Sequence, residues 1–192
     1  MLEYENKYTQ HKFICGVDEA GAGPVAGPVV ACAIIMPKGL TIPGVTDSKK
    51  LSEKKRNMLE IEIKRFAIAY SLYFVDNNIV DEINILQARL QAMKNAVDSL
   101  SQKPDFALVD GHIYPLNMPG ICIKKGDSLS HSIACASILA KVARDEHMVK
   151  AHDTYPQYNF AKHKGYGTKA HFESIKNHGL CPIHRKTFLK NL

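Results

Sequence analysis

The 192-residue sequence lacks the marks of a secreted or membrane-spanning protein. Its five cysteines are an odd number without a C-x-x-C pair, so no disulfide framework is expected and a reducing compartment, the cytoplasm, is favoured. The opening residues MLEYENKYTQHK are polar and mixed in charge, and no signal peptide is expected there. The longest apolar runs, such as VVACAIIM, are too short to cross a bilayer, so no membrane partner is expected.

Negative charge is in the minority. The chain carries 25 Lys and Arg against 19 Asp and Glu, a net charge of +6. A modest excess of this kind fits a polyanion such as nucleic acid, although many proteins share it. Hydrophobic residues make up 45% of the chain, enough for a single core. We expect a core of residues 1–150 and an extension of residues 151–192, where Tyr, His, Lys and Gly become frequent.

The pattern of apolar residues alternates between strands and helices. Short runs rich in Val, Ile and Cys predict strands over residues 13–17, 29–36, 67–75, 106–109 and 121–123. Apolar spacings of three and four predict helices over residues 53–66 (with Ser52 as N-cap), 78–100, 128–149 and 169–177. The first two strands can pair antiparallel through a short connection, whereas the later strands need helical crossovers and are expected to be parallel. The expected fold is an α/β sheet flanked by helices.

Four carboxylates lie at the ends of predicted elements. Asp18 and Glu19 follow the first strand, Asp110 ends another, and Asp127 precedes a helix. If the strands that bear Asp18 and Asp110 are neighbours, their acids converge and a cation must offset the repulsion. Oxygen ligands suit Mg²⁺ or Mn²⁺, and two such ions can hydrolyse a phosphodiester. The structural alternatives are a turn at Asp110, a helix N-cap at Asp127 and a solvated Asp18-Glu19 pair.

A glycine-rich stretch, GAGPVAGP, follows the first two acids. It is not a phosphate loop of the GK[ST] type, because no Lys-Ser/Thr follows it, and its glycines lack the spacing of a dinucleotide fingerprint. An anion-binding backbone turn and a plain turn both stay open at this point.

Six blocks of sequence are more specific when they are taken together. They occur in the order GVDEAGAGPVAGPVVACAI, TDSKKLSEKKR, DFALVDG, KGDSLSHSIACASILAKVARD, HKGYGTKAH and CPIHRKTF. In this combination, residues 13–188 closely resemble the bacterial ribonuclease HII family. The resemblance implies a ribonuclease H-like fold, with a five-stranded mixed sheet flanked by helices and a C-terminal helical extension. It also implies a monomeric, metal-dependent endoribonuclease that cleaves the RNA strand of RNA–DNA hybrids and incises at single ribonucleotides in duplex DNA, leaving 3′-hydroxyl and 5′-phosphate ends.

The resemblance assigns the acids to one catalytic centre. The principal metal-binding positions of the family fall on Asp18, Glu19 and Asp110, and its fourth acidic position falls on Asp127. All four are therefore expected to be catalytic and to hold two ions of Mg²⁺ or Mn²⁺.

The resemblance also implies which residues read the substrate. The family uses a Gly-Arg-Gly turn and a tyrosine at the RNA–DNA junction, and these positions match Gly21-Ala22-Gly23 and Tyr166. Alanine at position 22 departs from the arginine of the family. Because the missing guanidinium could pair with phosphate, we expect weakened substrate binding with an intact metal site.

Polar and basic side chains elsewhere suit contacts with phosphate groups. The expected contacts are Ser48, Lys49, Lys141, Arg144 and Lys164. Pairing of Lys141 and Arg144 with Asp145 on the same helix is the alternative for those two.

Three other interpretations stay open. His171, His178, Cys181 and His184 have the ligand types of a zinc site, but no close cysteine pair accompanies them and we disfavour that site. A hybrid-binding protein with impaired catalysis is the alternative raised by Ala22, and the complete set of carboxylates argues against it. A metal phosphatase that acts on small phosphate esters is disfavoured by the Lys, Tyr and Gly loops spread along the chain.

Overall fold

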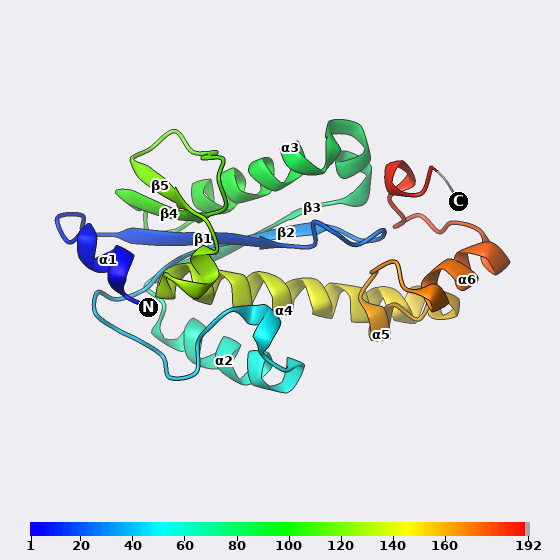
Figure 1. Ribbon diagram of the computed structural model, residues 1–192, viewed down its shortest axis with the longest axis horizontal. Helices are drawn as coiled ribbons and strands as arrows, with labels where there is room; N and C mark the ends of the chain where they lie inside the picture. The colour runs from blue at the N-terminus through cyan, green and yellow to red at the C-terminus, as the bar shows by residue number, and fades with distance from the viewer. Residues whose placement is uncertain (191–192) are drawn as a thin grey trace.

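One five-stranded mixed sheet forms the centre of the protein (Figure 1). The computed structural model describes residues 1–190. The strands lie in the order β3-β2-β1-β4-β5, and their bounds are Ile14–Ala20 for β1, Val29–Ile35 for β2, Ala69–Val75 for β3, Phe106–Asp110 for β4 and Gly120–Ile123 for β5. The predicted α/β fold class with a five-stranded mixed sheet is confirmed.

The directions of the strands follow the prediction with one exception. β1 pairs antiparallel with β2, and β4 runs parallel to both β1 and β5, as expected. β3, which follows a helix, pairs antiparallel with the outer edge of β2, so the expectation of a parallel strand there is wrong. A helix between two strands permits a parallel crossover but does not require one, because the chain can also return along the edge of the sheet.

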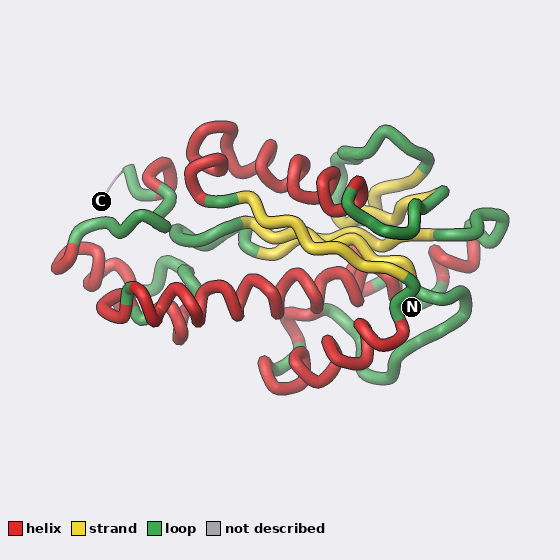
Figure 2. Tube along the Cα trace, turned by 180° about the vertical axis from the view of Figure 1, so that it is seen from behind, coloured by secondary structure: helices red, strands yellow, loops and turns green. Residues whose placement is uncertain are grey.

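Helices cover both faces of the sheet. α3 (Asn77–Asp98) lies on one face and α4 (His131–Thr154) on the other, with α2 (Glu53–Phe66) packed outside α4 (Figures 1 and 2). The remaining helices are short: α1 (Glu3–Lys7), α5 (Phe160–His163) and α6 (Lys169–His178). All seven residues of β2 are buried, because each face of that strand meets a helix-covered core.

α4 lies very close to β1 at one point. A Cβ atom built on Gly16 would lie 2.2 Å from the carbonyl carbon of Ser132 and 2.5 Å from the amide nitrogen of Ile133. Any side chain at position 16 would therefore push α4 away from the sheet. The glycine brings the first turn of α4 against β1, next to the predicted acidic residues.

Two element bounds differ from prediction in ways that matter for the site. β1 continues to Ala20, so Asp18 and Glu19 lie within the strand and not after it. The N-cap of α4 is Ser130, whose hydroxyl accepts a hydrogen bond from the amide of Ile133, and the predicted cap at Asp127 is wrong. Asp127 lies instead in a short 3₁₀ turn, η2 (Gly126–Ser128). The predicted N-cap at Ser52 is confirmed, since its hydroxyl accepts from the amide of Lys55.

The C-terminal lobe, residues 155–190, packs against the end of α4 and the loop between β1 and β2 (Figures 1 and 2). Its small core includes Tyr158, Phe160 and Ile175, which meet Ala26 from that loop and Met148 from α4. α4 runs across residue 150, and the division into residues 1–150 and 151–192 stays a prediction. Within residues 1–190, no helix combines the length and the apolar character needed to cross a membrane.

Candidate active site

The predicted acidic residues Asp18, Glu19, Asp110 and Asp127 lie together at the end of the sheet where β1 and β4 terminate, a region called the acidic edge below. β1 and β4 are parallel neighbours, and Val17 pairs with Val109, so Asp18 and Asp110 occupy the next position along each strand. Their carboxylates therefore leave the sheet at the same edge, at the carboxyl ends of both strands. The carboxylate of Asp110 accepts a hydrogen bond of 2.7 Å from the amide of Gly126, which brings the turn carrying Asp127 to the same place.

Burial makes this acidic edge electrostatically costly. Burial raises the pKa of the Asp18 carboxyl well above its usual range, and the negative charges of Glu19 and Asp110 raise it further. Burial also raises the pKa of Glu19, against the opposing charge of Arg89, and burial raises the pKa of Asp127. A cluster of carboxyl groups whose charged forms are disfavoured in this way attracts cations.

The donor atoms at this edge fit a divalent cation. The Oε2 atom of Glu19 is buried and has no hydrogen-bond partner, so it retains its full capacity as a ligand. Asp127 is met by the ammonium group of Lys49, with 3.5 Å between Nζ and Oδ2, and that lysine is itself largely exposed. Within residues 1–190, no three acidic, histidine or cysteine side chains close on one point as a finished coordination shell. Oxygen-only donors of this kind suit Mg²⁺ or Mn²⁺.

Arg89 is a charged member of the site that the sequence did not suggest. Its guanidinium forms an ion pair with the Oε1 atom of Glu19, and its Nε atom is buried without a hydrogen-bond partner. The residue lies on α3, between the apolar residues Leu86 and Met93 that share its side of the helix. The sequence held one sign of this role: Arg89 lies three residues after Leu86 and four before Met93, on the apolar side of the helix. A charged side chain on that side needs an oppositely charged partner.

The glycine loop, residues 21–28, lies beside Tyr166 as the prediction requires. A Cβ atom built on Gly23 would lie 3.9 Å from the ring of Tyr166 and would meet nothing closer. The amide of Val25 donates a hydrogen bond of 2.9 Å to the carbonyl oxygen of Gly165, which fixes the two segments together. Gly21 has a φ of +100°, a conformation that favours glycine, and a Cβ there would collide with Arg144.

Two buried arginines hold these segments in place. Arg144 donates to the carbonyl oxygens of three residues: Pro28 at 3.0 Å, Ala26 at 3.0 Å and Lys164 at 2.9 Å. Arg185, which the sequence did not suggest, donates to the carbonyl oxygens of Gly21 at 2.7 Å, Ala22 at 3.2 Å and Gly27 at 2.9 Å. Burial lowers the pKa of Arg144 to about 10 and that of Arg185 to about 9, so both stay charged at neutral pH. This geometry favours a structural role for Arg144 over the predicted phosphate contact.

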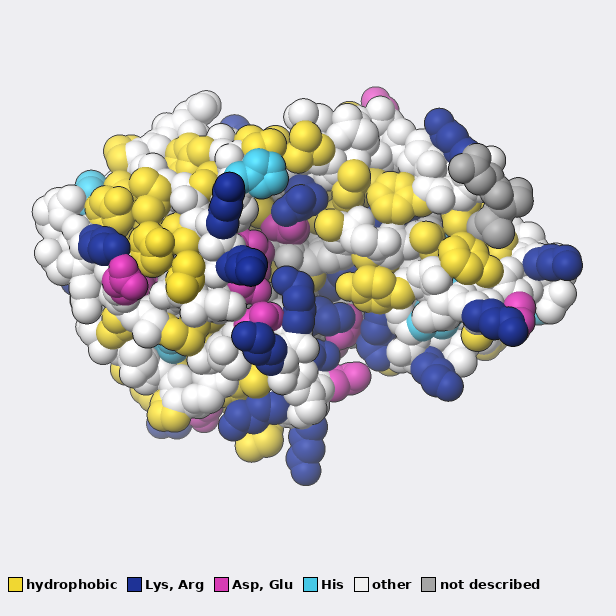
Figure 3. Space-filling view, viewed as in Figure 1, with side chains coloured by type: hydrophobic (Ala, Val, Ile, Leu, Met, Phe, Trp, Pro, Cys, Tyr) yellow, Lys and Arg dark blue, Asp and Glu magenta, His cyan; other side chains and the backbone are white. Residues whose placement is uncertain are grey.

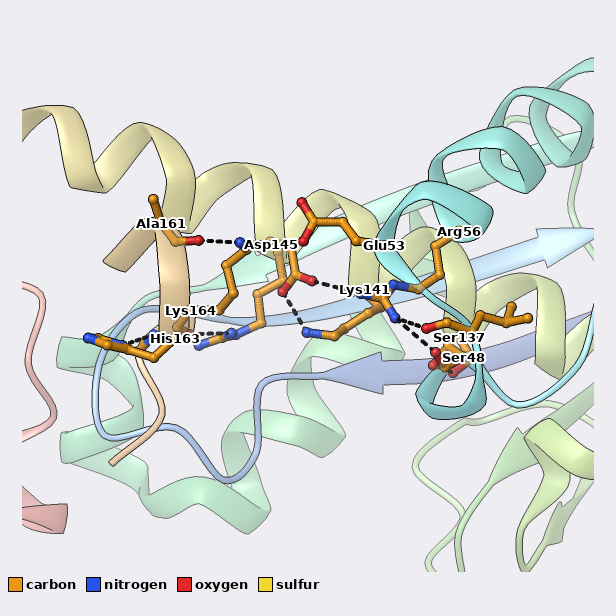
Figure 4. A network of polar contacts seen from close by, with 12 residues as sticks. Ser48, Glu53, Arg56, Ser137, Lys141, Asp145, Ala161, His163 and Lys164 are labelled. Atoms are coloured by element: carbon orange, nitrogen blue, oxygen red, sulfur yellow. Dashed lines mark hydrogen bonds and ion pairs between the residues drawn. The ribbon is translucent and has the colours of Figure 1, made fainter. Parts of the chain in front are cut away.

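Three of the other predicted phosphate contacts, Ser48, Lys141 and Lys164, line a polar network between α2, α4 and α5 (Figure 4). Lys141 pairs with Asp145 at 2.6 Å, as the alternative from the sequence allowed, and Arg56 approaches the same carboxylate at 3.5 Å. The hydroxyl of Ser48 lies 2.9 Å from that of Ser137 on α4. Lys164 lies 3.7 Å from the exposed carboxylate of Glu53.

Positive side chains gather around the acidic ones in the middle of one face of the molecule. Figure 3 shows Lys and Arg side chains surrounding Asp and Glu side chains at a hollow between the sheet and the C-terminal lobe. Lys49 and Lys141 are among the residues that the contacts above place near this region. Such a surface suits an anionic polymer that brings its phosphates to a metal centre.

Comparison with known proteins decides the family. A family model described as Ribonuclease HII matches residues 15–191. The chain is 56% identical over 183 residues to the Ribonuclease HII of Caldicellulosiruptor saccharolyticus, covering 95% of this chain and 89% of that protein. The chain belongs to the ribonuclease HII family. It is therefore a metal-dependent endoribonuclease that cleaves RNA in RNA–DNA hybrids.

Solved structures agree with the ribonuclease HII fold. The crystal structure of the ribonuclease H2 from Pyrococcus horikoshii OT3 matches with a TM-score of 0.76 and 27% identity, covering 92% of this chain and 93% of that one. A crystal structure of Bst-RNase HIII in complex with Mn²⁺ matches with a TM-score of 0.69 and 18% identity, covering 87% of this chain and 63% of that one. The latter likeness concerns the fold alone.

Proposed function

We propose that this ribonuclease HII hydrolyses phosphodiesters with two Mg²⁺ or Mn²⁺ ions held by Asp18, Glu19, Asp110 and Asp127. The observation that carries the proposal is that Asp18 and Asp110 lie together at the carboxyl ends of β1 and β4, with Glu19 next in the strand and the turn of Asp127 bonded to Asp110. When bound, the ions would activate water for attack on the phosphate and offset charge on the departing 3′-oxygen, leaving 3′-hydroxyl and 5′-phosphate ends. The unpartnered Oε2 of Glu19 supports its role as a ligand.

The substrates would be long RNA–DNA hybrids and duplex DNA that contains single ribonucleotides, as in ribonucleotide excision repair. The group that separates the two sugars is the 2′-hydroxyl, which both donates and accepts hydrogen bonds. Gly21, Ala22 and Gly23 would offer backbone to it, while the exposed ring of Tyr166 would stack against the sugar. The closeness of Gly23 to the ring of Tyr166, with 3.9 Å from an added Cβ atom to the ring, supports a shared role of these residues at the ribose.

Phosphate groups on either side of the cleavage point would meet the basic network. The side chain of Lys49 is largely exposed, whereas Lys141 would exchange its partner Asp145 for phosphate. The side chain of Lys164 is mostly buried and its ammonium group donates to the carbonyl oxygen of Ala161, so it too would have to exchange a partner for phosphate. Ser48 would add a hydroxyl, whereas Arg144 would act by holding the glycine loop. We further propose that the protein acts as a monomer in the cytoplasm. Its five free cysteines support the cytoplasmic location.

Alanine at position 22 would make this enzyme less efficient than one with arginine there. Its side chain is half-buried, and its carbonyl oxygen is held by Arg185, so the turn keeps its shape without an arginine at that position. The missing guanidinium would cost affinity for phosphate and not the metal site. We therefore propose a lower kcat/KM than an arginine at position 22 would give.

The experiment that tests the function uses a DNA duplex with one embedded ribonucleotide, beside a long RNA–DNA hybrid and an all-DNA duplex. With Mg²⁺ or Mn²⁺, we expect incision of the first two substrates and none of the third. Failure to incise the single-ribonucleotide duplex at high enzyme concentration with either ion would overturn that part of the proposal. Binding of both RNA-containing duplexes without cleavage would favour the hybrid-binding alternative.

The same assay tests position 22. The Ala22→Arg variant is expected to raise kcat/KM on the hybrid, by about tenfold for one added charged hydrogen bond. Equal affinity for Mn²⁺ in both proteins is the control, because the change leaves the carboxylates untouched. Unchanged kcat/KM under first-order conditions would show that the arginine position carries no binding energy in this chain.

A further inference from the structure

Two buried histidines of the C-terminal lobe form a pair that the reaction does not explain. His171 lies on α6 and His184 on the following loop, and each side chain has at most 1% of its surface exposed. Their Nε2 atoms are 3.0 Å apart, a hydrogen-bond distance that requires one donor and one acceptor. The pair lies 13 residues apart in sequence, so tertiary packing brings them together.

The neighbours of the pair determine where each proton resides. The Nδ1 atom of His171 lies 2.8 Å from the carbonyl oxygen of Tyr166, which can only accept, so Nδ1 of His171 carries the proton. In a neutral ring its Nε2 must then accept, and Nε2 of His184 must donate. This leaves Nδ1 of His184 as an acceptor, and the amide of Cys181 donates to it at 2.9 Å. The donors therefore run in one direction from Cys181 to the carbonyl of Tyr166.

The surroundings keep both rings neutral. Burial lowers the pKa of His171 to about 4 and lowers the pKa of His184 below its ordinary value, and the nearby His163 lowers both further. The ring of His163 stacks on the ring of His171, with 4.3 Å between the ring centroids. Its Nε2 donates to the carbonyl oxygen of Tyr158 at 2.6 Å, and its Nδ1 accepts from the amide of Gly165 at 3.2 Å.

This series of hydrogen bonds joins two segments, and each of them contacts the glycine loop. At one end, Tyr166 faces Gly23. At the other, the loop after Cys181 bonds to the glycine loop directly: Ile183 accepts from the amide of Gly27 at 2.8 Å, and the amide of Arg185 donates to Val25 at 2.8 Å. The histidine pair is therefore a second, internal link between Tyr166 and the loop that bonds to the glycine loop, beside the direct hydrogen bond from Val25 to Gly165.

We propose that His171 and His184 are positioning residues, whose directed hydrogen bonds fix the backbone of Tyr166 against the glycine loop and thereby set affinity for the ribonucleotide. This inference rests on the proposed function, in which Tyr166 and the glycine loop contact the ribose. Both imidazoles are buried in the lobe, so in this proposal they act through Tyr166 and not by touching substrate. Their loss is expected to weaken substrate binding and to spare the chemical step.

The first test reads the protonation states directly in the unaltered enzyme. Nitrogen NMR of ¹⁵N-histidine-labelled protein at neutral pH is expected to show His171 as the neutral Nδ1–H form and His184 as the neutral Nε2–H form. A charged ring at either position, or the opposite form, would overturn the proposal. This measurement needs no variant and does not depend on whether a variant folds.

The second test separates positioning from packing. His184→Gln keeps an N–H group within reach of His171, whereas His184→Leu fills the space without one. We expect His184→Leu to raise KM on the hybrid about tenfold, as for a buried polar group left unpaired, with kcat and Mn²⁺ affinity unchanged. His184→Gln should restore most of the loss. Equal KM values for the two variants would assign the residue to packing alone and overturn the proposal.

Two controls distinguish this inference from the proposed function on which it rests. His178→Gln, an exposed histidine at the end of α6, should leave KM unchanged. Tyr166→Ala should raise KM at least as much as His184→Leu. If Tyr166→Ala has no effect while the NMR result is as expected, the proposed ribose contact fails and the histidine assignment stands. If Tyr166→Ala raises KM and His184→Leu does not, only the positioning role fails.

Discussion

The acidic edge of the sheet and the contact between the glycine loop and the C-terminal lobe are built by different means. Asp18 and Asp110 are placed by the register of two parallel strands, and backbone hydrogen bonds fix that register. The glycine loop is placed by side chains, since Arg144 and Arg185 each donate to carbonyl oxygens of residues more than 100 positions away. One region inherits its geometry from the sheet, and the other depends on single residues.

The difference teaches how each region should respond to substitution. Removing a carboxylate from the acidic edge deletes charge but leaves the strands where they are. Removing a buried arginine leaves several carbonyl oxygens without donors and releases the segments they held. Changes at the acidic edge should therefore act on the reaction, and changes at the lobe should act on stability and on substrate affinity.

Asp18→Asn is expected to have the largest effect on the reaction. Loss of one ligand charge should lower hybrid cleavage by about a thousandfold or more. In the presence of a chelator the same change should raise the free energy of unfolding, because a buried carboxyl group among Glu19 and Asp110 becomes neutral. Cleavage rates and urea denaturation measure the two effects.

The matched control for that variant is Asp98→Asn, an exposed carboxylate at the end of α3 that pairs with Lys94. It should change neither cleavage nor stability appreciably. Retained cleavage by Asp18→Asn would refute the assignment of the metal ligands.

Arg185→Met is expected to show the opposite balance. Three carbonyl oxygens of the glycine loop would lose their charged donor, so the free energy of unfolding should fall by about 3 kcal/mol. KM on the hybrid should rise, while Mn²⁺ affinity should stay constant because the acidic edge is independent. Calorimetric titration and denaturation curves test this.

Arg65→Met, at an exposed position on α2, is the control for losing an arginine as such. Loss of Mn²⁺ affinity in Arg185→Met would break the comparison, because it would mean that the two regions are not built independently.

The pH dependence of stability is expected to show a smaller effect. The pKa of His171 is about 4 in the folded protein and 6.5 in an ordinary environment, so the unfolded chain binds the proton more readily. The stability contributed by the neutral ring is fully present above pH 6.5 and is lost as the pH falls toward 4. Between pH 7 and pH 5 the loss should be about 2 kcal/mol.

Comparison with His171→Gln isolates this term, because the raised pKa values of Asp18 and Glu19 act in the opposite direction in both proteins. The wild-type protein should lose more stability than the variant over this range. Parallel curves of unfolding free energy against pH would show that His171 does not titrate as its burial requires.

Much of the acidic edge could be predicted from sequence. Strand-forming runs, the short connection between the first two strands and the positions of Asp18 and Asp110 all depend on local pattern and on the parallel register. The position of Asp127 was harder to predict, because Asp127 and Ser130 are both good helix N-caps. Tertiary contacts decide between them. Glu5 of α1 accepts hydrogen bonds from Ser130 and Ser132, and α4 therefore begins after Ser130, three residues beyond Asp127.

The lobe could be predicted only in part. Tyr166 and the glycine turn came from the family resemblance, and the structure brings them together. The roles of Arg144 and Arg185 could not be read from sequence, since a buried arginine and an exposed one have the same local pattern. Their partners are backbone carbonyls, which leave no trace in residue type. Arg89 was missed for a related reason, as its partner Glu19 lies 70 residues away along the chain.

The lack of a side chain at Gly16 limits which substitutions the proposed active site can accept during evolution. That residue lets the first turn of α4 rest on β1, and the turn carrying Asp127 leads directly into α4. The separation between Asp18 on β1 and Asp127, both proposed metal ligands, thus depends on how closely α4 packs on Gly16, a residue without a functional group. A mutational scan restricted to charged residues would miss Gly16, where one added methyl group would push α4, and with it the turn of Asp127, away from β1.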